Sequence, residues 1–84
     1  MNLKELAKKY YDTREGNTSQ LIIDYLGDVK KVPEDIIEEE YAKAYRSFET
    51  YLSYFKKQDI LIEKGIDPKK HREYRLTKQL YDLS

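Results

Sequence analysis

The sequence contains no cysteine, so disulfide bonds and thiolate metal sites are excluded. The single histidine, His71, cannot form a multi-histidine metal site, and no cysteine or second histidine could act with it in nucleophilic catalysis. The three glycines, Gly16, Gly27 and Gly65, lie far apart, so the chain has no glycine-rich phosphate-binding loop. We therefore expect no metal ion, no cofactor and no enzyme activity.

A long apolar run is also missing. No stretch approaches the ~18 residues needed to span a bilayer, and residues 1–5 lack the apolar segment of a signal peptide. We therefore expect a cytoplasmic protein with no membrane partner. Hydrophobic residues make up 39% of the chain and charged residues 38%, a composition typical of an ordered protein. A chain of 84 residues has enough apolar material for one core, so we expect residues 1–84 to form a single domain.

The chain carries no net charge, because 16 Lys and Arg balance 16 Asp and Glu. The two signs are unevenly distributed, with 8 basic against 11 acidic residues in positions 1–55, and 8 against 5 in positions 56–84. If the chain binds a polyanion, its last third is expected to do so. Lys, Glu, Ile and Tyr are abundant, as in many thermophile proteins. Proteins encoded by AT-rich genomes, including those of viruses and phages, show the same bias, so composition leaves the source open.

Two asparagines mark the expected starts of the first two helices. Asn2 precedes Glu5 by three positions, as in a capping box, and apolar residues then recur at helical spacing, so we expect a helix over residues 3–11. Asn17 and Gln20 have the same spacing. A second helix is therefore expected to follow Asn17.

Gly27 is expected to end that second helix, and Pro33 fits the first turn of a third one. The third helix begins with an acidic run, which could be a solvated helix start or a surface for a basic partner: Glu34, Asp35, Glu38, Glu39 and Glu40. Residues 34–57 allow two interpretations. They could form one long helix, because neither glycine nor proline interrupts them, or break near residues 41–44 into a helix-turn-helix.

Within this segment the apolar residues recur at three- and four-residue steps and share one stripe: Tyr41, Tyr45, Phe48, Leu52 and Phe55. The opposite face is the candidate DNA-reading face, because its side chains can bond to base edges or phosphates: Arg46, Glu49, Thr50, Ser53 and Lys57. Arg46 is the most informative of these, since a planar guanidinium matches the two acceptors of guanine. Any soluble amphipathic helix has a polar face, so an ordinary solvated surface is the alternative.

Beyond this helix the pattern indicates a hairpin. Residues 60–64 read as a short apolar strand, residues 72–77 alternate polar with apolar, and Gly65 with Asp67-Pro68 marks the turn between them. The hairpin carries a cluster of cations that can follow a phosphate backbone: Lys64, Lys69, Lys70, Arg72 and Arg75. An ordinary solvated loop is again the alternative.

With these elements, residues 33–77 resemble a winged helix-turn-helix domain. Asp35-Ile36 opens the positioning helix, and the small residues Ala42 and Ala44 stand at the turn. The resemblance implies a mainly α fold with a small β-hairpin, an α+β arrangement of three to four helices plus a two-stranded wing. It also implies duplex DNA binding. The acidic run departs from the family pattern, because the positioning helix of DNA-binding members lies close to phosphate.

The predicted function is that of a small DNA-binding protein, a transcriptional regulator that reads duplex DNA with its recognition helix and basic wing. We expect a homodimer, because one small reader offers few base contacts and two half-sites multiply them. The alternative is a protein-binding module, such as a viral or phage inhibitor or assembly factor, that acts through its acidic helix or tyrosine-rich surface. Zero net charge favours the alternative, and the uneven charge distribution favours DNA binding.

Overall fold

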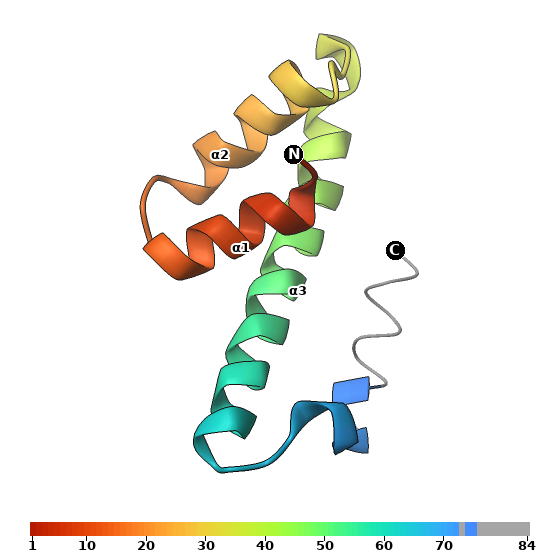
Figure 1. The fold of residues 1–84 in the computed structure, drawn as a ribbon. Helices are drawn as coiled ribbons and strands as arrows, with labels where there is room; N and C mark the ends of the chain where they lie inside the picture. Colours follow the sequence, from red (N-terminus) through yellow and green to blue (C-terminus); the bar gives the residue numbers. More distant parts are fainter. Residues whose placement is uncertain (73, 76–84) are drawn as a thin grey trace.

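The computed structural model describes residues 1–72, 74 and 75, and helices form its frame (Figure 1). The three α-helices are α1 (Leu3–Thr13), α2 (Thr18–Asp24) and α3 (Ile37–Glu63). Shorter helical segments connect or follow them: a π-helix at Tyr25–Val29 and 3₁₀-helices at Glu34–Ile36 and Pro68–Lys70. No residue in the described ranges belongs to a β-strand. The expected α+β fold with a two-stranded wing is therefore wrong.

The long helix α3 is the axis of the molecule, which measures 46 × 26 × 17 Å. In Figure 1, α1 lies across the middle of α3, and α2 runs back toward the end where α3 begins. Both short helices contact α3. One side of α3 therefore faces α1 and α2, and we call that side the inner face.

The first two helices begin where the sequence predicted. The side-chain oxygen of Asn2 accepts a hydrogen bond from the backbone N–H of Glu5 at 2.8 Å, and Asn17 accepts one from Gln20 at 3.1 Å. Each bond satisfies an N–H that has no partner within its own helix. The helix α1 ends at Thr13, and the residue that caps it, Arg14, has a left-handed φ of 58°.

We expected Gly27 to end the second helix, and this prediction is wrong. The chain stays helical through Gly27 in the π-helix, and Gly27 is not among the residues with positive φ. Tyr25 and Leu26, at the start of this segment, are 9% and 1% exposed and lie three and four positions after the buried Ile22. The three side chains therefore share one face at ordinary helical spacing.

Residues 37–63 form one unbroken helix, so the helix-turn-helix interpretation is wrong and the long-helix interpretation is confirmed. The same helix includes residues 60–63, which contradicts the predicted first strand of the wing. Neither glycine nor proline occurs between Pro33 and Gly65, so nothing in the backbone stops a helix that has already nucleated. Leu61 lies two turns after Tyr54, and both are buried.

The predicted returning strand is also wrong in its described part, because Arg72, Tyr74 and Arg75 are helical. Tyr74 is 5% exposed and stacks on Tyr54, with ring centroids 5.1 Å apart. Their hydroxyl oxygens lie 2.6 Å apart in a hydrogen bond. This aromatic pair ties the segment after α3 back onto the helix. Residues 73, 76 and 77 of the predicted strand lie outside the described residues.

The core follows the predicted stripe with one exchange. Phe48 is fully buried, Phe55 is nearly so, and Leu52 is half-buried. Tyr45, which we expected on the core stripe, is 39% exposed, and Tyr54 takes a core position instead at 6% exposed. The segment after α3 covers the side of the helix that carries Tyr54, which periodicity within α3 does not reveal.

Candidate functional site

The candidate reading face is divided between exposed and half-buried residues. Arg46, Glu49 and Ser53 are exposed, whereas Thr50 and Lys57 are half-buried. The Thr50 hydroxyl donates a hydrogen bond to the Arg46 carbonyl at 2.8 Å, so it is engaged with the helix backbone. We define the outer face of α3 by the exposed residues on this side: Ala42, Tyr45, Arg46, Glu49, Ser53, Lys56 and Ile60.

A shallow hollow lies on the first half of the outer face, lined by Tyr41, Ala42, Tyr45, Arg46, Glu49, Thr50 and Ser53. The rings of Tyr41 and Tyr45 are 5.9 Å apart in a tilted contact. The Tyr41 hydroxyl donates to the Ser19 hydroxyl at 2.9 Å, which fixes that ring against α2. Both tyrosines were expected on the apolar stripe of α3, and their part in this surface was not predicted.

A second hollow follows on the second half of α3, lined by Tyr11, Arg14, Leu52, Ser53, Lys56, Asp59, Ile60 and Glu63. Within it the Tyr11 hydroxyl donates a 2.5 Å hydrogen bond to the Asp59 carboxylate. This bond, together with partial burial and the Asp59 charge, raises the pKa of Tyr11 above its ordinary 10.0. The Arg14 guanidinium, 4.8 Å from the Tyr11 ring, acts in the opposite direction on that pKa. Tyr11 therefore stays protonated at neutral pH and serves as a link between α1 and α3.

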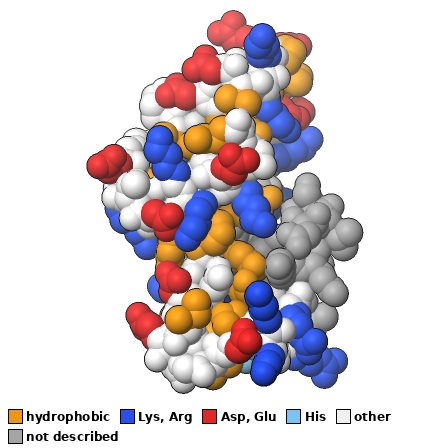
Figure 2. All heavy atoms as spheres, viewed as in Figure 1, with side chains coloured by type: hydrophobic (Ala, Val, Ile, Leu, Met, Phe, Trp, Pro, Cys, Tyr) orange, Lys and Arg blue, Asp and Glu red, His pale blue; other side chains and the backbone are white. Residues whose placement is uncertain are grey.

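The predicted wing cations gather where the chain leaves α3, and we call this group the basic end: Lys64, Lys69, Lys70, Arg72 and Arg75. All five are exposed. In the part of the chain that the structure describes, the ion pairs are Lys8–Asp12 and Lys43–Glu40, and neither includes a residue of the basic end. Figure 2 shows Lys and Arg side chains collected at the lower right, near the end of α3.

The structure does not bring all ten predicted site residues onto one surface. Arg46 lies in α3 and Lys64 directly follows its last residue, so the two are ~27 Å apart along the helix axis at ~1.5 Å per residue. The acidic run lies at the start of α3, so it is farther still from the basic end. The basic end and the candidate reading face are thus separate surfaces of the molecule.

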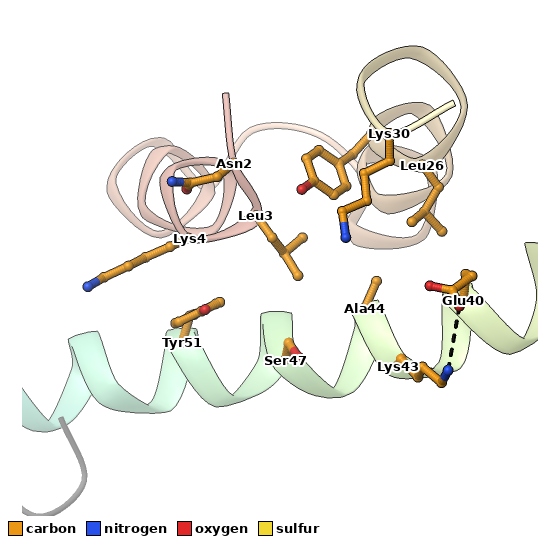
Figure 3. A pocket seen from close by; sticks show the side chains of 11 residues that line it. Asn2, Leu3, Lys4, Leu26, Lys30, Glu40, Lys43, Ala44, Ser47 and Tyr51 are labelled. Carbon is orange, nitrogen blue, oxygen red and sulfur yellow. Dashed lines mark hydrogen bonds and ion pairs between the residues drawn. The ribbon is translucent and has the colours of Figure 1, made fainter. Parts of the chain in front are cut away.

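A third hollow, which the sequence analysis did not predict, lies between the start of α1, the π-helix and α3 (Figure 3). In Figure 3 Lys30 reaches into the space between the helices, while Lys43 turns away and pairs with Glu40 at 3.5 Å. Lys4 lines the same space. Among the described residues no buried side-chain polar atom lacks a hydrogen-bond partner, so this hollow holds no buried group waiting for a ligand.

The described residues contain no group of three or more His, Cys, Asp or Glu side chains arranged to hold a metal ion. No helix within residues 1–72, 74 and 75 combines the length and the apolar character needed to cross a membrane. Comparison of the chain with protein-family models, with curated proteins and with solved structures finds no match. The function must therefore be argued from the surfaces described above.

Proposed function

We propose that this chain binds duplex DNA by holding the phosphate backbone with the basic end. The main support is that five exposed cations occupy one end of the molecule. None of them has an ion-pair partner among the described residues. Exposed cations that contact phosphate release counterions from DNA, and that release drives association. Arginine adds planar, bidentate phosphate recognition through Arg72 and Arg75.

The acidic run of residues 34–40 does not oppose this binding, because it lies at the far end of α3, and the two exposed acids beside the basic end, Glu63 and Asp67, are outnumbered by its five cations. A helix with the bounds Ile37–Glu63 is ~40 Å long at ~1.5 Å per residue. The Debye length at physiological salt is ~8 Å, so the acidic run is screened from a phosphate held at the basic end. Zero net charge is therefore compatible with a basic binding surface.

The proposed contacts are to the backbone and not to base edges. The long helix α3 has no preceding positioning helix in a helix-turn-helix arrangement, and Arg46 lies far from the basic end. Backbone contacts position a protein on DNA but carry no direct sequence information. We therefore expect affinities that differ little between duplexes of different sequence.

The test is a fluorescence anisotropy titration of labelled duplex DNA at ~50 and ~200 mM salt. Replacing Lys69 and Lys70 by glutamine should lower affinity about tenfold at the lower salt and reduce the log–log salt slope by ~1.8, because each phosphate contact contributes ~0.9. The matched control is Lys30→Gln with Lys31→Gln, an exposed lysine pair near the opposite end. The control should retain wild-type affinity.

Two outcomes contradict the proposal. One is an absence of binding to mixed-sequence duplex at ~50 mM salt, where backbone contacts are strongest. The other is an equal loss of affinity in the two lysine-pair variants, which would show that the position of the charge does not matter.

A protein-binding function is the second candidate, and the hollow around Tyr45 favours it. Tyrosine and arginine are enriched among the residues that contribute most to protein interfaces, and here Tyr41, Tyr45 and Arg46 lie together. A stoichiometric partner recovered from lysate of the native host by wild-type protein, and lost with Tyr45→Ala, would support this function. Retention of that partner by Tyr45→Ala would exclude the hollow as its site.

A further inference from the structure

Four exposed residues of the outer face are placed symmetrically about one point on α3. Tyr45 and Ile60, which are 39% and 40% exposed, lie at equal distances on either side of the midpoint between Leu52 and Ser53. Glu49 and Lys56 lie at equal, shorter distances from the same midpoint. These four residues therefore place an apolar group and a negative charge before the midpoint, and an apolar group and a positive charge after it.

These positions also share a strip of the helix surface. The steps from Tyr45 to Glu49, Leu52, Lys56 and Ile60 are four, three, four and four residues, the spacing of helix positions that face a neighbouring helix. A helix with a strip of this kind can pack lengthwise against another helix.

We propose that the outer face of α3 binds a second copy of this chain, with the two α3 helices antiparallel about a two-fold axis near Leu52 and Ser53. In an antiparallel pair, residues at equal distances on opposite sides of the axis come together. Glu49 then faces Lys56 of the second copy, and Tyr45 packs on Ile60 of the second copy. Each contact occurs twice.

A parallel arrangement has the opposite electrostatic result. Glu49 would face Glu49 of the second copy, and Lys56 would face Lys56, so both charges would meet their own sign. The antiparallel arrangement alone brings opposite charges together while it covers the exposed Tyr45 and Ile60. Charge complementarity therefore favours a second copy of this chain as the partner and an antiparallel direction for its α3 helix.

The shape of the outer face agrees with this arrangement. The two hollows along α3 share one lining residue, Ser53, which lies beside the proposed axis. A two-fold axis at this point places the first hollow of each copy opposite the second hollow of the other. The Ile60 side chain of one copy can then enter the hollow that contains Tyr45 in the other.

The proposal goes beyond DNA binding and does not depend on it, because none of these residues belongs to the basic end. The test is sedimentation equilibrium of the full chain at low salt, where wild-type protein should show twice the chain mass. Glu49→Lys and Lys56→Glu should each weaken dimerisation about tenfold or more, because each turns both opposite-charge contacts into repulsive ones. The double variant restores opposite charges and should return to within about threefold of wild type.

Circular dichroism should show unchanged helix content in all three variants, since both positions are exposed. A wild-type chain that stays monomeric at several hundred micromolar overturns the proposal. So does a double variant that dimerises no better than the single ones, because only a direct contact between the two positions predicts the rescue.

Cross-linking tests the location of the axis in a chain that has no natural cysteine. Ser53→Cys places one thiol beside the axis in each copy and should give a disulfide-linked dimer under mild oxidation. Thr13→Cys, an exposed position at the end of α1, is the control and should remain largely uncross-linked. Equal cross-linking at both positions contradicts the antiparallel geometry.

Discussion

The inner and outer faces of α3 belong to one helix and differ in almost every physical property. The inner face buries Ala44, Phe48 and Phe55 beneath α1 and α2, and rings from α1 reach it, with Tyr10 and Phe48 centroids 5.8 Å apart. The outer face exposes Arg46 and Glu49, and its hollows are open to solvent. One helix therefore contributes to the hydrophobic core on one side and exposes polar and charged side chains to solvent on the other.

The largest test of this difference uses two adjacent residues. Phe48→Ala should destabilise the protein by about 3–5 kcal/mol, because it leaves a cavity in a small core. Glu49→Ala, one position along on the outer face, should change the free energy of unfolding of the monomer by less than about 0.5 kcal/mol, measured at high salt and low protein concentration, where the proposed dimer dissociates. Chemical denaturation of both variants measures this contrast. Similar losses in the two variants would show that the outer face is covered within the folded chain.

Tyr11 lies at the border between the two faces and offers a smaller test. Tyr11→Phe removes the hydrogen bond to Asp59 and should cost about 1 kcal/mol at neutral pH. Because the folded state raises the Tyr11 pKa above 10.0, this contribution is fully present below the unfolded pKa and is lost as pH rises through the raised folded pKa.

Denaturant titrations of wild type and Tyr11→Phe at neutral pH and above pH ~10 check this dependence. The difference between the two proteins should be constant at neutral pH and shrink in the alkaline range. A difference that grows with pH would mean that the hydroxyl does not donate to Asp59 in the folded state.

Local signals in the sequence predicted the helix starts correctly. The caps at Asn2 and Asn17 involve partners only three residues away, so their geometry follows from the sequence itself. The buried positions of Phe48 and Phe55 also follow from helical period, because one side of a long helix must face the core. These features depend on short-range spacing, which the sequence displays directly.

The prediction of a wing was wrong because it used local signals, whereas the conformation of this segment depends on contacts with distant residues. Residues 60–62 are β-branched or aliphatic and favour a strand locally, but the preceding helix continues into them and Leu61 is buried. Tyr74 is held by its contact with Tyr54, twenty positions earlier. Local propensity predicts neither the helical state of residues 60–62 nor the contact of Tyr74, since each depends on how the segment after α3 packs against the helix.

Prediction of the candidate site was divided in the same way. Arg46, Glu49 and Ser53 share a face because of helical period, as expected. Their distance from Lys64 follows from the unbroken length of α3, which two open interpretations had left unsettled. The surface role of Tyr45 was missed because a tyrosine at core spacing was taken as buried.

The smallest test concerns the layer that covers the inner face. Tyr25 and Leu26 lie in the π-helix, which continues through Gly27, where an added Cβ would meet nothing within 4 Å. Gly27→Ala should therefore stabilise the protein by about 0.5 kcal/mol, because alanine loses less conformational freedom in a helix than glycine does. Gly65, with a φ of 75°, is the matched control, and Gly65→Ala should destabilise because an L side chain is strained there. Thermal melts of the two variants should thus shift in opposite directions. A loss of stability in Gly27→Ala would instead indicate a left-handed residue that ends α2, and the inner face would then be covered differently.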